Sequence, residues 1–245
     1  MAMRKIGLGL LTMIAVLLGG CDDDEGYASL TISLVPTYHG QKITSEQVIT
    51  DKTGRNFYLR DMRVYISDLN ILTDNGDKVL LEDLALMEWP GTKSSFQVTV
   101  PKDDYQGVEF YIGLDSVTNS ALPTDFEASH PLSAEQDMHW GMMKYRFLIF
   151  EGSVDTSVSG DLAPQRPLSF HLGRDALFTK VKIIRNVPIT GIGVFFTLNF
   201  EVNDMFDGDA GTIDISVDRV NYSGEAEMLK AGILMSNFAD SFQPD

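Results

Sequence analysis

The sequence predicts an all-β protein, an antiparallel β-sandwich of the immunoglobulin-like kind. Apolar and polar residues alternate over roughly ten short segments, which is the pattern of strands with one buried face. Turn residues separate these segments every 8 to 15 residues or so. Hydrophobic residues make up 44% of the 245 residues and charged residues 22%, so the chain can form a substantial core and is not a disordered protein.

The clearest predicted strand covers residues 57–72. Met62, Val64 and Ile66 would lie on one face of it, with the alternate residues on the other. A tight hairpin turn follows at 74–77, because an Asn-Gly pair accepts the positive φ angles of a type I′ turn. The other predicted strands are 30–34, which stops at Pro36, and then 79–81, 96–100, 106–113, 143–150, 168–172, 178–184, 193–202 and 212–220.

Two segments depart from this strand pattern. Residues 115–137 are long and polar and contain two prolines, so we expect a loop there, and loops of this length are often functional. Residues 224–242 have the spacing of a short C-terminal helix. Its apolar residues, which would face the body of the protein, are Met228, Leu229, Ile233 and Leu234.

The N-terminus has the features of a bacterial lipoprotein signal. A positive start precedes an uncharged run over residues 6–18, which is too short for a comfortable membrane span. The run ends in Leu-Gly-Gly before Cys21, the one cysteine of the chain, and this resembles a lipoprotein cleavage box. We expect residues 1–20 to be a lipoprotein signal peptide and Cys21 to be lipidated. The alternative is an ordinary cleaved signal with an incidental cysteine.

The segment after Cys21 indicates where in the cell the protein would be held. Residues 21–27 would form an acidic tether, and residues 28–242 a single domain. The acyl chains would hold the protein at a membrane of the cell envelope. An acidic run at this place resembles the surface-export signal of some Gram-negative lipoproteins, whereas an Asp directly after the cysteine resembles an inner-membrane retention signal. We favour the outer membrane, on a face that the sequence leaves open.

Charge and cysteine content exclude several classes of function. The formal net charge of −16 argues against nucleic-acid binding, which needs a basic face. A single cysteine excludes a disulfide framework and any site with several thiolate ligands. The sequence also contains no nucleophile elbow and no phosphate-binding glycine loop. We therefore expect a protein that is not an enzyme, and an envelope hydrolase is the least favoured interpretation.

The segment from Met138 to Phe147 is the richest in groups that bind soft metals. It contains Met138, His139, Trp140, Met142 and Met143. Thioether sulfur and imidazole suit Cu(I) better than they suit hard cations. The alternative is a buried central strand, because methionine fills irregular gaps in cores. A strand would place His139 and Trp140 on opposite faces, so a shared site would need a bend, which the glycine after Trp140 could supply.

The remaining histidines differ in their surroundings. His39 follows the first strand in a turn, and His130 lies before a proline in the long loop. His171 lies between Phe170 and Leu172, so it points outward if those two residues point into the core. From that position it could still face a ligand beside a neighbouring strand.

Four motifs occur in order between about residues 28 and 240. They are LRDMRVYISDL at 59–69, YIGLDSVTN at 111–119, MHW with YRF and EG at 138–152, and FHLG at 170–173. In this order they are similar to the motifs of the MbnP-like copper-binding family, which comprises methanobactin-associated periplasmic proteins and lipoprotein relatives. The resemblance implies a β-sandwich that binds copper in the cell envelope.

The resemblance also implies roles for individual residues. Some members have a tryptophan that a MauG-like dihaem cytochrome c peroxidase oxidises to kynurenine, and the matching residue here is Trp140. By the same matching of motifs His171 is a candidate ligand. Together with the composition of residues 138–147, this leads us to expect His171, His139 and either Met138 or Met142 as the ligands of Cu(I). His139 is particular to this chain, since the family usually has an aromatic residue at that position.

The chain departs from the family pattern in the third motif. It has Met142 where the family has a second tryptophan, and Lys144 where the family has a glycine before the tyrosine. If the missing tryptophan were the one that is oxidised, this chain could not mature in the same way. The alternative function is then a metal-free envelope lipoprotein that serves a surface transporter or a redox partner through its acidic surface.

Overall fold

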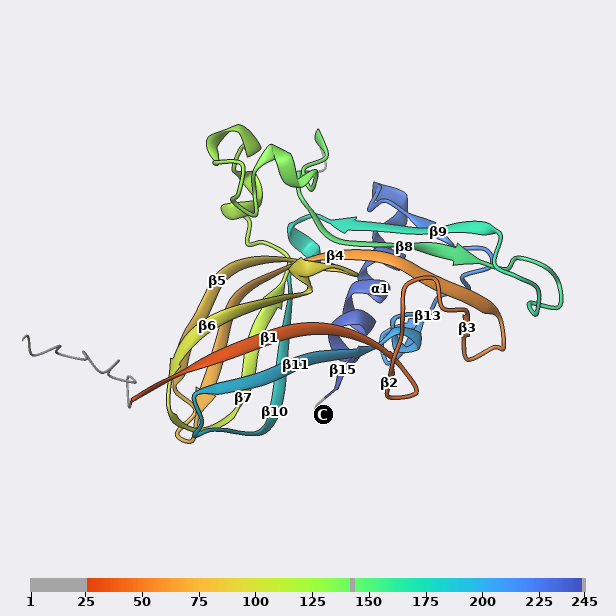
Figure 1. Cartoon of the computed structure of the whole chain (residues 1–245). Helices are drawn as coiled ribbons and strands as arrows, with labels where there is room; N and C mark the ends of the chain where they lie inside the picture. The colour runs from red at the N-terminus through yellow and green to blue at the C-terminus, as the bar shows by residue number, and fades with distance from the viewer. Residues whose placement is uncertain (1–25, 142–143, 244–245) are drawn as a thin grey trace, which may run out of the picture.

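The computed structural model describes residues 26–141 and 144–243 (Figure 1). The expected signal peptide, the lipidation site Cys21 and the candidate ligand Met142 lie outside the described residues. No helix in the described part is long and apolar enough to cross a membrane.

The first of two main sheets is built around β1 (Tyr27–Tyr38). On one edge β1 pairs antiparallel with β6 (Ser95–Pro101), and on the other it pairs parallel with β11 (Gly193–Glu201). Two short strands extend this sheet, namely β2 (Gln41–Lys42) beside β1 and β15 (Phe242–Gln243) beside β11.

The second sheet is built around the long strand β4 (Asn56–Thr73). Along one edge β4 pairs with β5 (Lys78–Trp89) through the predicted hairpin. Along the other edge its first half pairs with β8 (Arg146–Val154) and its second half with β7 (Asp103–Ile112). The outer strands are β9 (Arg166–Gly173) beside β8, β10 (Thr179–Ile189) beside β7, β14 (Val220–Asn221) beside β9, and β3 (Ile49–Thr50) beside β4.

β4 therefore changes partner at Tyr65. The register with β8 ends at Val64, and the register with β7 begins at Ile66. Residues 113–145 leave the sheet at the end of β7 and return at the start of β8, so this segment, the connecting loop, starts and ends at the same junction (Figure 1). Over residues 115–137 its regular structure is limited to short 3-10 turns, as predicted for a loop.

The core lies between the two sheets and is closed by the C-terminal helix α1 (Met228–Asp240) (Figure 1). Phe57, Phe150 and Phe170 surround Phe206, with ring centroids 5.4 to 6.0 Å apart. A fully buried phenylalanine contributes about 1.5–3 kcal/mol, so such a cluster is a principal stabilising element of the sandwich.

The predicted β-sandwich is confirmed, with three differences. The β1–β11 and β9–β14 pairs are parallel. Residues 212–220 are strand only at their ends, since Asp214 forms a turn by accepting hydrogen bonds from Ser216 N–H and Oγ–H. In the helix Leu229 is 79% exposed, because the face that packs on the core is carried by Leu234 and Phe238.

Two strand boundaries also differ. β1 continues past Pro36, whose carbonyl accepts a hydrogen bond from Ile43 N–H. β8 begins at Arg146, so Lys144 and Tyr145, which were predicted to belong to this strand, precede it.

Candidate functional site

The connecting loop is fixed to the sheet by two buried tyrosines. Tyr65 of β4 donates a hydrogen bond to Pro131 O at 2.8 Å, and Tyr145 donates one to Leu132 O at 2.8 Å. The two rings also meet edge to face, with centroids 6.1 Å apart. These contacts hold residues 131 and 132, within the loop, close to the junction where β4 changes partner.

In the last part of the loop, residues 138–140 lie antiparallel to residues 144–146 and form the two arms of a small hairpin. Trp140 N–H donates to Lys144 O at 2.7 Å, and Arg146 N–H donates to Met138 O at 2.9 Å. Gly141 and Lys144, at the inner ends of the two arms, have φ angles of 52° and 59°. Gly141 thus follows the first arm directly, at the position where the sequence suggested a bulge or bend.

A buried asparagine ties this hairpin to the rest of the loop. Asn119 Oδ1 accepts a hydrogen bond from Tyr145 N–H at 3.1 Å, and its Nδ2 donates to Asp175 Oδ1 at 2.7 Å. Asn119 is completely buried, so water cannot satisfy its side-chain amide, and both the amide oxygen and the amide nitrogen have protein partners. This residue is the last position of the motif at 111–119.

The hairpin separates the predicted site residues. His139 packs edge to face on Tyr145, with centroids 4.9 Å apart, while Trp140 packs on His171 at 5.6 Å. The guanidinium of Arg146 lies 5.6 Å from the centre of the Trp140 ring. Met138 is fully buried in the hydrophobic core. His139 and Trp140 thus contact different neighbours, as alternation along a strand requires.

His171 points away from the core, as the sequence predicts. Its neighbours Phe170 and Leu172 are fully buried, whereas the His171 side chain is 16% exposed. Its ring contacts both Trp140 and Tyr222, whose own rings lie 5.4 Å apart. Tyr222 reaches this position because β14 pairs with β9 at Ser169 and Phe170. We call Trp140, His171 and Tyr222 the aromatic cluster.

A carboxylate completes the surroundings of His171. His171 Nε2 lies 2.5 Å from Glu151 Oε1, and Ser169 Oγ donates to the same oxygen at 2.9 Å. Arg60 lies 3.5 Å from the other carboxylate oxygen. Burial raises the pKa of Glu151, but the hydrogen bonds from His171 and Ser169 and the charge of Arg60 outweigh it, and the net pKa is lowered. Glu151 is therefore held as a carboxylate.

The second ring nitrogen of His171 has no partner. Nδ1 is buried and makes no hydrogen bond within residues 26–141 and 144–243. Because a carboxylate can only accept, the proton of the neutral ring belongs on Nε2, and Nδ1 then carries a lone pair. Metal-binding histidines have this arrangement, in which one nitrogen donates to a carboxylate and the other binds the metal.

The lone pair on Nδ1 is suited to a soft metal ion, but one nitrogen is not a full set of ligands. Among the described residues no three or more His, Cys, Asp or Glu side chains are placed to hold a metal ion together. Burial lowers the pKa of His139, which keeps that ring neutral. The ring packs on Tyr145, however, whereas it is Trp140 that packs on His171. His139, Met138 and Met142 therefore stay predictions as ligands.

The other two histidines have structural surroundings. His39 lies in the turn between β1 and β2, where its backbone N–H donates to Glu201. His130 stacks on Phe126 in the connecting loop. Sequence reasoning missed Glu151 and Tyr222. Glu151 could have been found, since it belongs to the Glu-Gly pair of the third motif, whereas Tyr222 carries no signal of its own.

Fold and site together define a class of protein, a two-sheet sandwich that places a histidine–carboxylate pair under aromatic rings. The MbnP family model matches residues 27–228, and the chain belongs to this family. Among solved structures, MbnP from Methylosinus trichosporium has a similar fold, with a TM-score of 0.55 and 13% identity over 81% of this chain and 82% of that one. No curated protein matches. Membership of the family points to a copper-related binding protein.

Proposed function

We propose that the protein binds copper and that His171 is a ligand, through Nδ1. The observation that carries this proposal is the pair of His171 and Glu151. The carboxylate lies 2.5 Å from Nε2, and Nδ1 is buried and has no hydrogen-bond partner among the described residues. A buried polar atom without a partner costs free energy, and a metal ion would compensate for that cost.

The surroundings suit a monovalent soft metal. Neutral imidazole binds Cu(I) well, and the rings of Trp140 and Tyr222 lie against His171 on the solvent side. These two side chains are 42% and 36% exposed, so they can move to admit an ion to the buried nitrogen. The bound copper would be cargo or a stored ion, and the protein would not be a catalyst.

The further ligands and the anchor follow from sequence signals, and the modification of Trp140 follows from the family resemblance. His139, Met138 and Met142 are the candidates for additional donors. Cys21 would carry the lipid anchor that holds the protein to the outer membrane of a Gram-negative cell. Trp140, which contacts His171 and is partly exposed, would be the residue that a MauG-like dihaem peroxidase oxidises to kynurenine.

The test is an anaerobic Cu(I) titration against a competing chelator. The wild-type chain is compared with His171→Ala and with His39→Ala, a control histidine on an exposed turn. We expect His171→Ala to bind copper at least about tenfold more weakly, since one ligand is lost, and His39→Ala to bind like wild type. Equal affinities for both variants would remove His171 from the site.

A mass measurement on protein from its native envelope tests maturation and anchoring. A mass change on the peptide that contains Trp140, matching conversion to kynurenine, would support oxidation. Acyl chains on Cys21 would support the anchor. An unmodified Trp140 together with bound copper would point to a simpler histidine and methionine site.

The second candidate is a metal-free binding module of the envelope. The absence of a gathered three-residue ligand set in the described part of the chain favours it. In that case the wild-type chain would take up no copper under anaerobic loading. The acidic surface would then attract a basic partner, by steering more than by affinity.

A further inference from the structure

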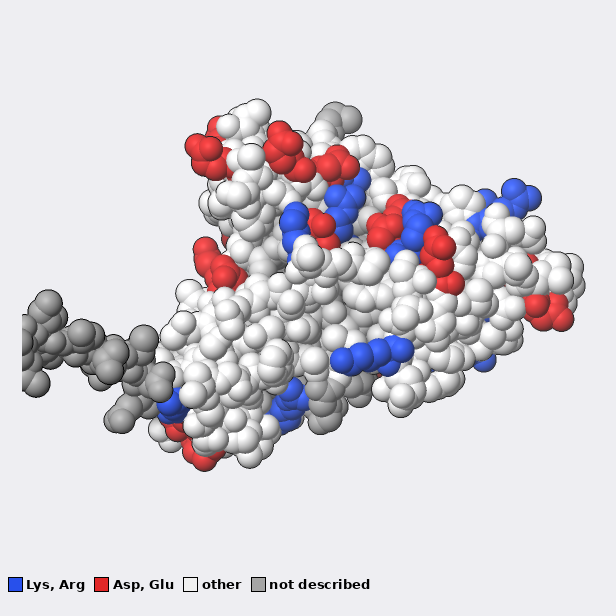
Figure 2. All heavy atoms as spheres, in the orientation of Figure 1, with Lys and Arg blue, Asp and Glu red and all other residues white. Residues whose placement is uncertain are grey.

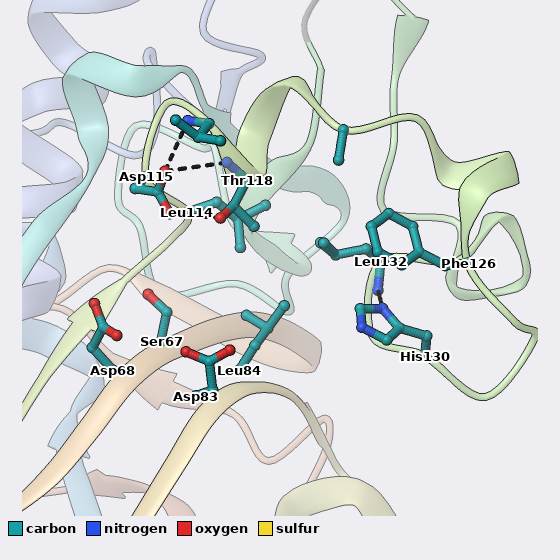
Figure 3. A pocket seen from close by; sticks show the side chains of 12 residues that line it. Ser67, Asp68, Asp83, Leu84, Leu114, Asp115, Thr118, Phe126, His130 and Leu132 are labelled. Atoms are coloured by element: carbon teal, nitrogen blue, oxygen red, sulfur yellow. Dashed lines mark hydrogen bonds between the residues drawn. The ribbon is translucent and has the colours of Figure 1, made fainter. Parts of the chain in front are cut away.

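A separate pocket lies under the connecting loop, and none of the residues of the aromatic cluster lines it. It has a volume of about 320 Å³. Its floor comes from β4 and β5, and its walls come from the loop (Figure 3). The lining residues are Ser67, Asp68, Asp83, Leu84, Leu114, Asp115, Val117, Thr118, Ala121, Phe126, His130 and Leu132. We call it the loop pocket.

The two ends of the loop pocket differ in chemistry. Phe126, His130 and Leu132 line one end, and Asp68, Asp83 and Asp115 line the other (Figure 3). Phe126 and His130 stack with ring centroids 4.3 Å apart and planes at 17°, which makes a flat wall. His130 is fixed there because its Nδ1 accepts a hydrogen bond from Leu132 N–H at 3.1 Å.

The acidic end has no positive charge of its own. None of the lining residues is Lys or Arg. Lys78, whose charge is felt at Asp68, makes its ion pair with Glu109 instead. Residues 113–143 of the loop contain five acidic residues and no Lys or Arg, and acidic side chains are visible on this part of the surface in Figure 2. Three carboxylates therefore line one pocket without a lining cation.

The backbone holds two of these carboxylates in place. Asp115 accepts hydrogen bonds from Val117 N–H and from both donors of Thr118, and the Thr118 hydroxyl makes the largest contribution to lowering the pKa of Asp115. Asp68 has a φ of 48° at a bulge of β4. Bulges of this kind redirect a side chain, and here the carboxylate is at the pocket.

We propose that the loop pocket binds a small organic cation, an amidinium or ammonium group carried on a flat or apolar body. The charged group would lie among the carboxylates, and the body would stack on the wall formed by Phe126 and His130. Cavities of about 300–1,000 Å³ with an apolar lining and a few convergent polar groups are typical of small-molecule sites. An amidinium matches a carboxylate through two parallel hydrogen bonds.

The test is a calorimetric titration of the full chain with benzamidinium and with benzamide, its neutral counterpart of the same shape. We expect benzamidinium to bind at least about tenfold more tightly, because its hydrogen bonds to carboxylate are charge-assisted. Equal binding of the two compounds, or no binding of either, would overturn the proposal.

Variants separate the pocket from the overall negative charge. Asp83→Asn should weaken benzamidinium binding about fivefold or more, while Asp74→Asn, the same charge change on the exposed β4–β5 turn, should leave it unchanged. Both positions are exposed, so both variants should fold. Equal effects of the two changes would mean attraction by net charge alone and would overturn the site.

Two further titrations identify the kind of ligand and test whether the loop pocket is separate from the proposed copper site. Acetyl-argininamide carries the guanidinium group of an arginine side chain. If it binds more tightly than benzamidinium, the pocket recognises an arginine of a partner protein, and the proposal of a small-molecule ligand is overturned. The His171→Ala variant should bind benzamidinium like wild type. Loss of binding in that variant would overturn the placement of the cation in a separate pocket.

Discussion

His171 Nε2 and Glu151 Oε1 lie 2.5 Å apart across the neighbouring strands β9 and β8. The register places His171 opposite Ile149 and Glu151 opposite Ser169, so the two side chains are diagonal neighbours on one face of the sheet. In the proposed copper site Glu151 would be a positioning residue. It would fix which nitrogen of His171 carries the proton and leave the other nitrogen for the metal.

Replacement of this carboxylate should weaken copper binding without removing a ligand. We expect Glu151→Gln to lower the Cu(I) affinity by about 10–100-fold, because partners of metal-bound histidines have effects of this size. The competition titration described for His171→Ala measures it. Glu135→Gln, the same change at an exposed position of the loop, is the matched control and should bind like wild type. Unchanged affinity in Glu151→Gln would show that the carboxylate does not orient the ligand.

The same pair should make stability depend on pH. The pKa of Glu151 is lowered in the folded protein from its ordinary 4.5, so the carboxylate stabilises the fold above that value. This contribution is lost as the pH falls through the lowered pKa. We expect wild type to be more stable than Glu151→Gln at pH 7, with a difference that shrinks steadily below pH 4.5. Urea unfolding at several pH values measures it, and a constant difference would contradict the expectation.

Gly113 should be intolerant of any side chain. Its φ is +98°, and a Cβ atom would lie 2.3 Å from Cδ2 of Phe147 in the core. We expect Gly113→Ala to destabilise the protein by about 3 kcal/mol, through strain and overpacking together.

A second glycine separates the two causes. Gly54 has a φ of +87° and open space around its position, so Gly54→Ala carries the backbone cost alone. Urea unfolding should show the smaller loss, about 1 kcal/mol, for this variant. Equal losses of unfolding free energy in the two variants would mean that Phe147 moves away from the new side chain at residue 113 without cost.

Asn119 should matter for the hairpin that carries Trp140. Asn119→Ala removes the hydrogen bonds of the Asn119 side chain to Tyr145 N–H and to Asp175. The buried N–H of Tyr145 is then left without an acceptor. We expect a loss of about 2 kcal/mol in the free energy of unfolding. Thr124→Ala, at an exposed position of the same loop, is the control and should change little. A neutral Asn119→Ala would show that the hairpin is held by Tyr65 and Tyr145 alone.

Local patterns predicted much of the fold because they report on burial. The alternation over 57–72 corresponds to β4, and the Asn-Gly turn corresponds to the β4–β5 hairpin. The pattern failed over 212–220, where apolar residues alternate but Asp214 favours a turn. It also placed Leu229 inward, whereas the helix face that packs on the core is carried by Leu234 and Phe238 and leaves Leu229 exposed.

By itself the sequence determined the strand pattern, the position of His171 on the outer face and the family. These follow from side-chain periodicity and from motifs that are short and local. Only the tertiary structure brought Glu151 and Tyr222 to His171, through the pairing of β9 with β8 and with β14. It also turned His139 toward Tyr145 and Trp140 toward His171. The physical reason is that periodicity fixes the face on which a residue lies, whereas its neighbours on that face depend on strand register, which is set by packing across the whole sheet.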